Sequence, residues 1–210
     1  MNATHLKNES SGIGIVSRLY QYYRLSASFL FAALLARWLV LLPLVGTKFL
    51  PGGIHEYLCY LILYASFGEL FCLFGFHGLF GALTSSTLLK NLNMLYFVAV
   101  MHFYDDYEHA PVLKNSSYSS FIIGLSFTQM YCHWKKLFKH THGRKNSIWR
   151  KVDTLAMMPL FYLSEFYLLL LNVQNPNFHS TLPLDRLNKF VLVVFIPLSL
   201  HMFKKQISSL

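Results

Sequence analysis

The sequence predicts an all-α protein, a polytopic bundle of about six transmembrane helices, with four to six as the range. The 210 residues are 54% hydrophobic and only 13% charged, whereas a soluble domain carries about 25% charged residues. Several apolar runs reach the roughly 20 residues that a helix needs to cross the hydrocarbon core. The formal charge of +9 lies in short segments between those runs, which is typical of the positive-inside rule and argues against nucleic acid as a partner.

The chain is expected to form a single transmembrane domain over residues 1–210, with the bilayer as its surroundings. Residues 25–46, 56–80 and 155–173 are the clear spans, and residues 190–203 form a shorter one. Residues 83–103 and 118–134 are weaker candidates because polar side chains interrupt them. The Pro51-Gly52-Gly53 triplet predicts a tight loop between the first two spans.

Charge predicts the orientation. Residues 135–151 are the densest basic segment, and we expect them to form a cytosolic loop. With six spans both termini are also cytosolic. If residues 83–103 do not cross, five spans remain and the N-terminus changes side. The sequon at Asn115 faces the lumen in this arrangement, so Asn115 is a candidate for glycosylation.

The segment before the first span, residues 1–24, is expected to be cytosolic. Val16, Leu19, Tyr20 and Tyr23 recur with helical spacing. This pattern indicates a short amphipathic helix on the membrane surface. The alternative is a simple extension of the first span.

Three ionisable residues fall inside confident spans and are expected to form an intramembrane polar cluster: Arg37, Glu69 and Glu165. A charge at the bilayer centre costs roughly 2.5–3.5 kcal/mol on insertion scales, so these side chains should turn away from lipid. Arg37 and Glu69 occur on successive antiparallel spans, which favours a pair. Glu165 is left to join Arg37, to meet a hydroxyl such as that of Tyr162, or to be protonated. The cluster either fixes the helices to each other or holds a polar group, a proton or a lipid headgroup.

No cofactor and no metal ion are expected. His140 and His142 could chelate, but no cysteine or carboxylate lies close to them in the basic segment. Residues 102–109 read H-x-x-D-D-x-x-H, yet they stand at the end of a span, where capping and solvated roles are common. The three cysteines have no metal-type spacing and are expected to be free thiols: Cys59, Cys72 and Cys132.

Residues 36–64 carry the most distinctive pattern, with RWLVLLPLVG at 37–46 and FLPGGI at 49–54, before an aromatic span that holds Glu69. This pattern resembles a small family of fungal endoplasmic-reticulum membrane proteins. That family supports cell-wall β-1,6-glucan synthesis by binding a glycosidase-like membrane protein of glucan synthesis. The resemblance implies a multi-pass, non-enzymatic helper in that membrane, with a membrane protein of the pathway as partner and no catalytic residues.

A second, weaker resemblance leads to a different hypothesis. Very-long-chain 3-hydroxyacyl-CoA dehydratases are also small six-span proteins, and they use a Tyr and a Glu for acid/base chemistry. Tyr162 and Glu165, one helical turn apart, would be the candidates here. The Arg-aromatic run, however, precedes the Glu69 span, an order that departs from the dehydratase pattern. The alternative to a helper is therefore an enzyme acting on a lipid or acyl-CoA.

Overall fold

The computed structural model describes residues 3–83, 85–103, 112–138, 148–175 and 182–208, and within these ranges it contains helices and no strand. This confirms the predicted all-α fold. The elements are α1 (Ala3–Leu83), α2 (Ser86–Val98), the π-helical turn η1 (Ala99–Phe103), α3 (Ser116–Leu137), α4 (Ile148–Val152), the π-helical turn η2 (Asp153–Met157), α5 (Met158–Gln174) and α6 (Leu182–Ile207).

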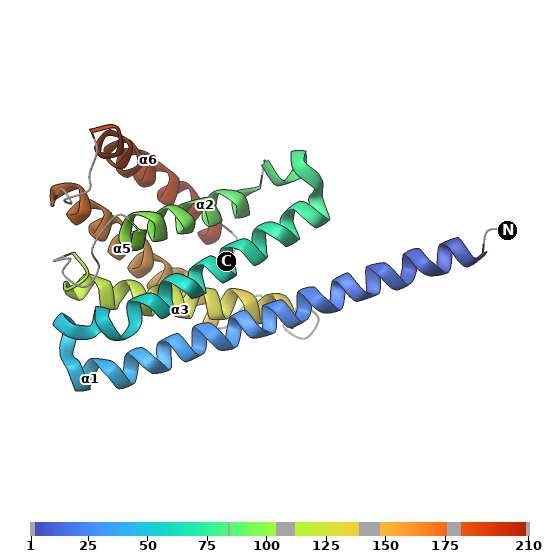
Figure 1. Cartoon of the computed structure of the whole chain (residues 1–210), viewed down its shortest axis with the longest axis horizontal. Helices are drawn as coiled ribbons and strands as arrows, with labels where there is room; N and C mark the ends of the chain where they lie inside the picture. The colour runs from blue at the N-terminus through green and yellow to red at the C-terminus, as the bar shows by residue number, and fades with distance from the viewer. Residues whose placement is uncertain (1–2, 84, 104–111, 139–147, 176–181, 209–210) are drawn as a thin grey trace.

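Helix α1 folds back on itself (Figure 1). The bend is at Gly46, where φ is 70° and ψ is 176°, a backbone conformation that favours glycine. We call residues 3–45 the first arm and residues 47–77 the second arm. The predicted loop at 51–53 is wrong, because these residues are helical. Pro51 is the fifth residue after Gly46, so its missing N–H falls just beyond the four that have no partner in a helix, where proline disturbs the helix less than further inside.

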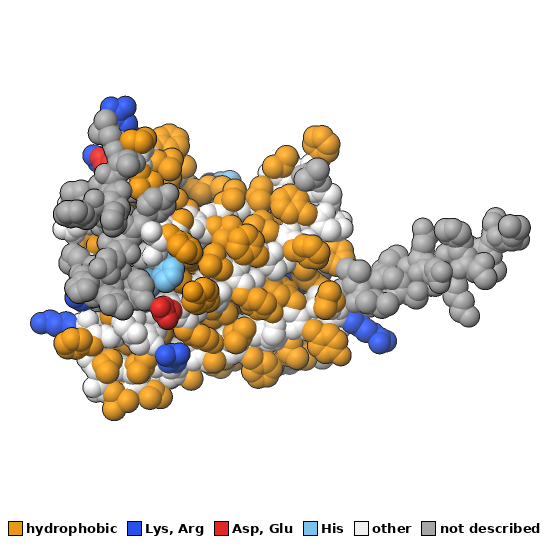
Figure 2. All heavy atoms as spheres, viewed as in Figure 1, with side chains coloured by type: hydrophobic (Ala, Val, Ile, Leu, Met, Phe, Trp, Pro, Cys, Tyr) orange, Lys and Arg blue, Asp and Glu red, His pale blue; other side chains and the backbone are white. Residues whose placement is uncertain are grey.

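Among the described residues, three helical segments are long and apolar enough to cross a membrane: Ser17–Phe76, Ile148–Gln174 and Pro183–Ile207. The first has 60 residues and, folded at Gly46, supplies two crossings. The most apolar window of each segment is little buried within the molecule: 11% of it in the first segment, 33% in the second and 6% in the third. The hydrophobic side chains of these windows therefore face outward. The face seen in Figure 2 is covered by such side chains, with most of its charges near the edges.

The two weaker spans of the sequence are helical as well. Helix α3 has 22 residues, and α2 with η1 runs continuously from Ser86 to Phe103. Helix α3 is central, because it contacts both α1 and α5. It buries polar side chains such as Ser126 and Gln129 along with its apolar ones. That mixture explains why hydropathy marks this helix only weakly.

An aromatic stack joins α2, α3 and α5 in the core. The rings of Phe97 and Phe121 lie 4.3 Å apart between centroids, and those of Phe121 and Phe161 lie 5.5 Å apart. Gly124 lets α5 approach α3, since a Cβ atom there would lie 2.9 Å from the Cα atom of Phe161. The close packing of α3 and α5 therefore depends on the missing side chain at Gly124.

Residues 17–24 continue the first arm as part of α1. The Tyr23 hydroxyl donates a hydrogen bond of 2.6 Å to the carbonyl of Ala65, and the Tyr20 ring packs against Phe76. These side chains face the second arm. The side chain of Val16 and residues 139–147 of the basic segment lie outside the described part of the structure.

Candidate functional site

Glu69, on the second arm of α1, is buried at the meeting point of three basic side chains. Its Oε2 atom lies 3.2 Å from Lys90 Nζ on α2. Its Oε1 atom lies 3.9 Å from Arg24 Nη1 on the first arm and 3.8 Å from Lys136 Nζ on α3. A single carboxylate thus connects both arms of α1 with α2 and α3.

Neutral side chains complete this site. Asn91 Nδ2 donates a 3.2 Å hydrogen bond to Glu69, and Lys90 donates one of 3.1 Å to Gln129. His133 is buried between Arg24 and Glu69, at 3.5 Å and 4.0 Å. The Arg24 guanidinium also donates to the Tyr20 hydroxyl. We call Arg24, Glu69, Lys90, Asn91, Gln129, His133 and Lys136 the Glu69 cluster.

The Glu69 cluster carries more positive than negative charge. Three permanent cations surround one carboxylate, so the cluster keeps an excess of two positive charges with His133 neutral. Lys90 and Lys136 are partly exposed, with 29% and 43% of their side chains accessible. Long lysine stems allow the ammonium groups to reach polar surroundings while their carbons stay apolar. The ion pairs of the Glu69 cluster therefore hold the helices together, while the ammonium groups of Lys90 and Lys136 keep some access to solvent.

Glu165, on α5, has different surroundings. It is fully buried, and its Oε1 atom accepts a 2.6 Å hydrogen bond from Asn93 Nδ2 on α2. The neighbouring Tyr162 ring packs against Phe161 and Phe195. A cavity of about 30 Å³, lined in part by Asn93, Tyr162 and Phe195, is large enough for one or two water molecules.

The structure does not bring Arg37 together with either carboxylate, so the predicted cluster of Arg37, Glu69 and Glu165 is corrected. Arg37 is exposed, and its guanidinium carbon lies 5.6 Å from the centre of the Tyr57 ring. The reason is the register of the two arms of α1, that is, which residues lie opposite each other. With the bend at Gly46, Glu69 lies 23 residues after the bend and Arg24 lies 22 residues before it. The two residues therefore face each other across the arms.

Sequence reasoning missed most of the Glu69 cluster. Arg24 falls in the segment before the first span, Lys90 in the weak span at 83–103, and Lys136 in the basic segment at 135–151. The available signal was the glycine at position 46, because it fixes which residues of the two arms are opposite each other. The partners on α2 and α3 had no comparable signal.

Asn115 has a local structural role. Its side-chain oxygen accepts a 3.1 Å hydrogen bond from the backbone N–H of Ser117, so it caps the N-terminus of α3. The amide nitrogen, to which a glycan would be attached, is not the atom used for capping. Glycosylation at Asn115 stays a prediction.

The fold and the Glu69 cluster define a helical membrane protein whose spans are joined by a buried ion network. The chain is 56% identical over 195 residues to the β-1,6-glucan synthesis-associated protein KEG1 of Saccharomyces cerevisiae, which covers 93% of this chain and 98% of that relative. The chain therefore belongs to the family of that protein, as the pattern at residues 36–64 predicted. No family model matches the sequence, and no solved structure matches it.

Proposed function

We propose that this protein is a non-enzymatic helper of cell-wall β-1,6-glucan biosynthesis in the endoplasmic-reticulum membrane, and that it acts by binding a membrane protein of that pathway. The observation that carries the proposal is the 56% identity, over almost the full length of both chains, to a relative named for its association with β-1,6-glucan synthesis. The apolar outer faces of the helices suit a protein that works within the bilayer.

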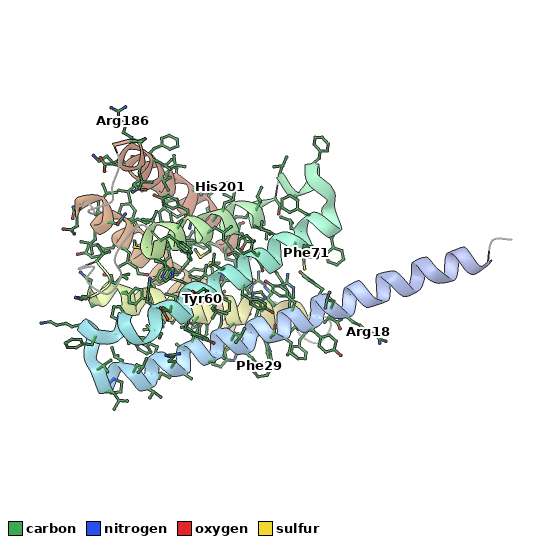
Figure 3. The ribbon with its side chains drawn as sticks, viewed as in Figure 1. Arg18, Phe29, Tyr60, Phe71, Arg186 and His201 are labelled. Carbon is green, nitrogen blue, oxygen red and sulfur yellow. The ribbon has the colours of Figure 1, made fainter. Side chains whose placement is uncertain are left out.

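The second arm offers a surface for such a partner. Its outer side carries exposed aromatic side chains at intervals of three or four residues, which places them in one row along the helix. This aromatic row consists of Tyr60, Tyr64, Phe67, Phe71 and Phe74. Figure 3 labels Tyr60 and Phe71 on this arm and Phe29 on the first arm. We assign the aromatic row to contact with a transmembrane helix of the partner, since helices associate in lipid chiefly through close packing.

The enzyme alternative has less support. Of its two candidates, Tyr162 lines a cavity of about 30 Å³ and Glu165 does not, whereas pockets for organic ligands measure roughly 300–1,000 Å³. Glu165 is also hydrogen-bonded to Asn93 inside the bundle. An acyl substrate has no room at these side chains in this conformation, so the geometry favours the helper.

The test is purification of the tagged full-length protein in mild detergent, with co-purifying membrane proteins identified by mass spectrometry. We expect a membrane protein of glucan synthesis to be captured, and depletion of this protein to lower wall β-1,6-glucan. The double change Phe67→Ala and Phe71→Ala should reduce capture. The matched control is Val193→Ala with Leu200→Ala, at exposed positions of α6.

A second arm of the experiment separates the helper from the enzyme. In a helper, Tyr162→Phe with Glu165→Gln leaves wall glucan unchanged as long as the protein remains abundant. In an enzyme, the same change leaves abundance intact while a lipid or acyl intermediate accumulates. Accumulation of such an intermediate would overturn the proposed function.

A further inference from the structure

Three potential metal ligands meet at the end of the bundle that holds the Gly46 bend, away from the Glu69 cluster. They are His55 and Cys59 on the second arm of α1 and His102 on η1, and their ligand atoms all lie within 4.8 Å of one another. His55 and Cys59 are fully buried, and His102 is half-buried. Two sequence-distant elements therefore place one thiol and two imidazoles around a common point.

The His55 ring is oriented by a neighbour. Its Nδ1 atom lies 2.8 Å from the hydroxyl of Tyr118, a buried residue of α3, while its Nε2 atom lies 3.5 Å from Cys59 Sγ. When Nδ1–H donates to the Tyr118 oxygen, Nε2 is the ring nitrogen on the side of the thiol. Metal-binding histidines are held in this way, through a hydrogen bond from the nitrogen that does not bind the ion.

Local structure brings the remaining groups into place. His55 and Cys59 are four residues apart on a helix, so they share one face. His102 lies in the π-helical turn Ala99–Phe103, and its ring centre is 5.5 Å from that of His55. Short π-helical turns inside α-helices are rare and frequent at functional sites. Here the turn stands at the residue that completes the trio.

We propose that His55, Cys59 and His102 bind a zinc ion. A thiolate with imidazoles is a ligand set that zinc favours, and three protein ligands leave a fourth tetrahedral position for water or another donor. From Zn–N and Zn–S bond lengths, ligand atoms of such a site lie roughly 3.3–3.7 Å apart. The His55–Cys59 separation of 3.5 Å already fits, and a rotation of the His102 side chain supplies the third ligand.

The protons and charges involved in zinc binding at this site can be accounted for. Zinc displaces the proton of the Cys59 thiol, which leaves to solvent, and both histidines bind as neutral imidazoles. The site then carries one net positive charge. Glu56 lies three residues before Cys59 on the same helix, so its carboxylate is close enough to offset that charge. The ion would join the second arm of α1 to η1.

This inference differs from the sequence expectation of no metal ion. That expectation rested on the basic segment and on residues 102–109, of which 104–109 lie outside the described structure. The H-x-x-x-C spacing at His55 and Cys59 was readable, but the third ligand lies more than 40 residues further along the chain. Only the packing of η1 against α1 brings His102 within reach.

The experiment measures metal in the full-length protein, purified in mild detergent without chelators. We expect about one zinc ion per chain by inductively coupled plasma mass spectrometry. Cys59→Ser and His102→Ala should each lower zinc content at least about tenfold, in line with the effect of losing a ligand or its support. Cys72→Ser is the matched control, because Cys72 lies on the same arm but outside the trio, and it should retain zinc.

Cobalt provides a second readout. Apo-protein titrated with Co²⁺ should develop a thiolate-to-cobalt charge-transfer band in the near ultraviolet, in wild type and Cys72→Ser but not in Cys59→Ser. Size-exclusion profiles identify any variant that has lost its fold. If Cys59→Ser has lost its fold, His102→Ala replaces it in the comparison. Zinc retained after loss of Cys59, copper found in place of zinc, or wild-type protein that takes up neither zinc nor cobalt would overturn the proposal.

Discussion

The two glutamates that are buried in the described part of the chain have opposite surroundings. Glu69 lies among Arg24, Lys90 and Lys136, whereas Glu165 meets the neutral amide of Asn93. The difference follows from position along the helices. Glu69 is nine residues from the second bend of α1 at Gly78, close enough to the end of the bundle for lysine ammonium groups to stay partly exposed. Glu165 lies deep within its span, where a neutral partner avoids a second costly charge.

The comparison teaches that a carboxylate inside a span can have two distinct structural uses. At Glu69 the charge itself holds helices together, and its removal leaves cations without a counter-charge. At Glu165 a hydrogen bond is enough, and an uncharged side chain of the same shape can make it. Substitution of glutamate by glutamine, which removes the charge but preserves the shape, therefore separates the two cases. The first prediction below makes this change at Glu69, and the last makes it at Glu165.

The largest effect is expected for Glu69→Gln. The change leaves Arg24, Lys90 and Lys136 next to each other without a carboxylate, and breaking a buried ion pair from one side costs about 3–5 kcal/mol. Thermal unfolding in detergent should show a strong loss of stability, with lower abundance in cells. The control is Asp185→Asn at the exposed Asp185–Lys189 pair of α6, which should change stability by less than about 1 kcal/mol.

The next largest effect distinguishes the two arginines of the first arm. Arg24→Gln should destabilise the protein by about 1–3 kcal/mol, because it removes a charged hydrogen-bonding group from the Glu69 cluster. Arg37→Gln should leave stability almost unchanged, since Arg37 is exposed and lies over Tyr57. Equal losses in the two variants, measured by the same thermal unfolding assay, would contradict the register set by Gly46.

A moderate effect is expected at the close contact between α3 and α5. In Gly124→Ala the added methyl group meets the backbone of Phe161 at 2.9 Å, so α3 and α5 must separate, at a cost of about 1–3 kcal/mol. Gly75→Ala serves as the control, because nothing lies within 4 Å of a Cβ atom there. Unfolding temperatures of the two variants provide the measurement.

The smallest effect is expected for Glu165→Gln. Glutamine keeps the shape and the oxygen that accepts from Asn93, so the free energy of unfolding should change by less than about 1 kcal/mol. Asn93→Leu, which removes the donor, should cost more than Glu165→Gln in the same assay. A loss at Glu165→Gln as large as that at Glu69→Gln would mean that the charge of Glu165 is also needed.

Much of the fold was readable from the sequence, because hydropathy alone distinguishes apolar spans from the polar segments between them. The pairing of side chains was not. Placing the first turn at Pro51–Gly53 instead of Gly46 shifts the residue opposite Glu69 away from Arg24. The Asn93–Glu165 bond joins residues 72 positions apart, and no local periodicity encodes such a contact. That a charge lies within an apolar helix was thus easier to predict than its partner.

The bend at Gly46 limits where residues can be inserted into or deleted from the sequence. The two arms are joined by almost no intervening loop, so every contact between them is fixed by its distance from one glycine. One added residue anywhere between positions 24 and 69 would turn the following helix by about 100° and move Arg24 out of line with Glu69. Insertions and deletions should therefore be poorly tolerated in this hairpin.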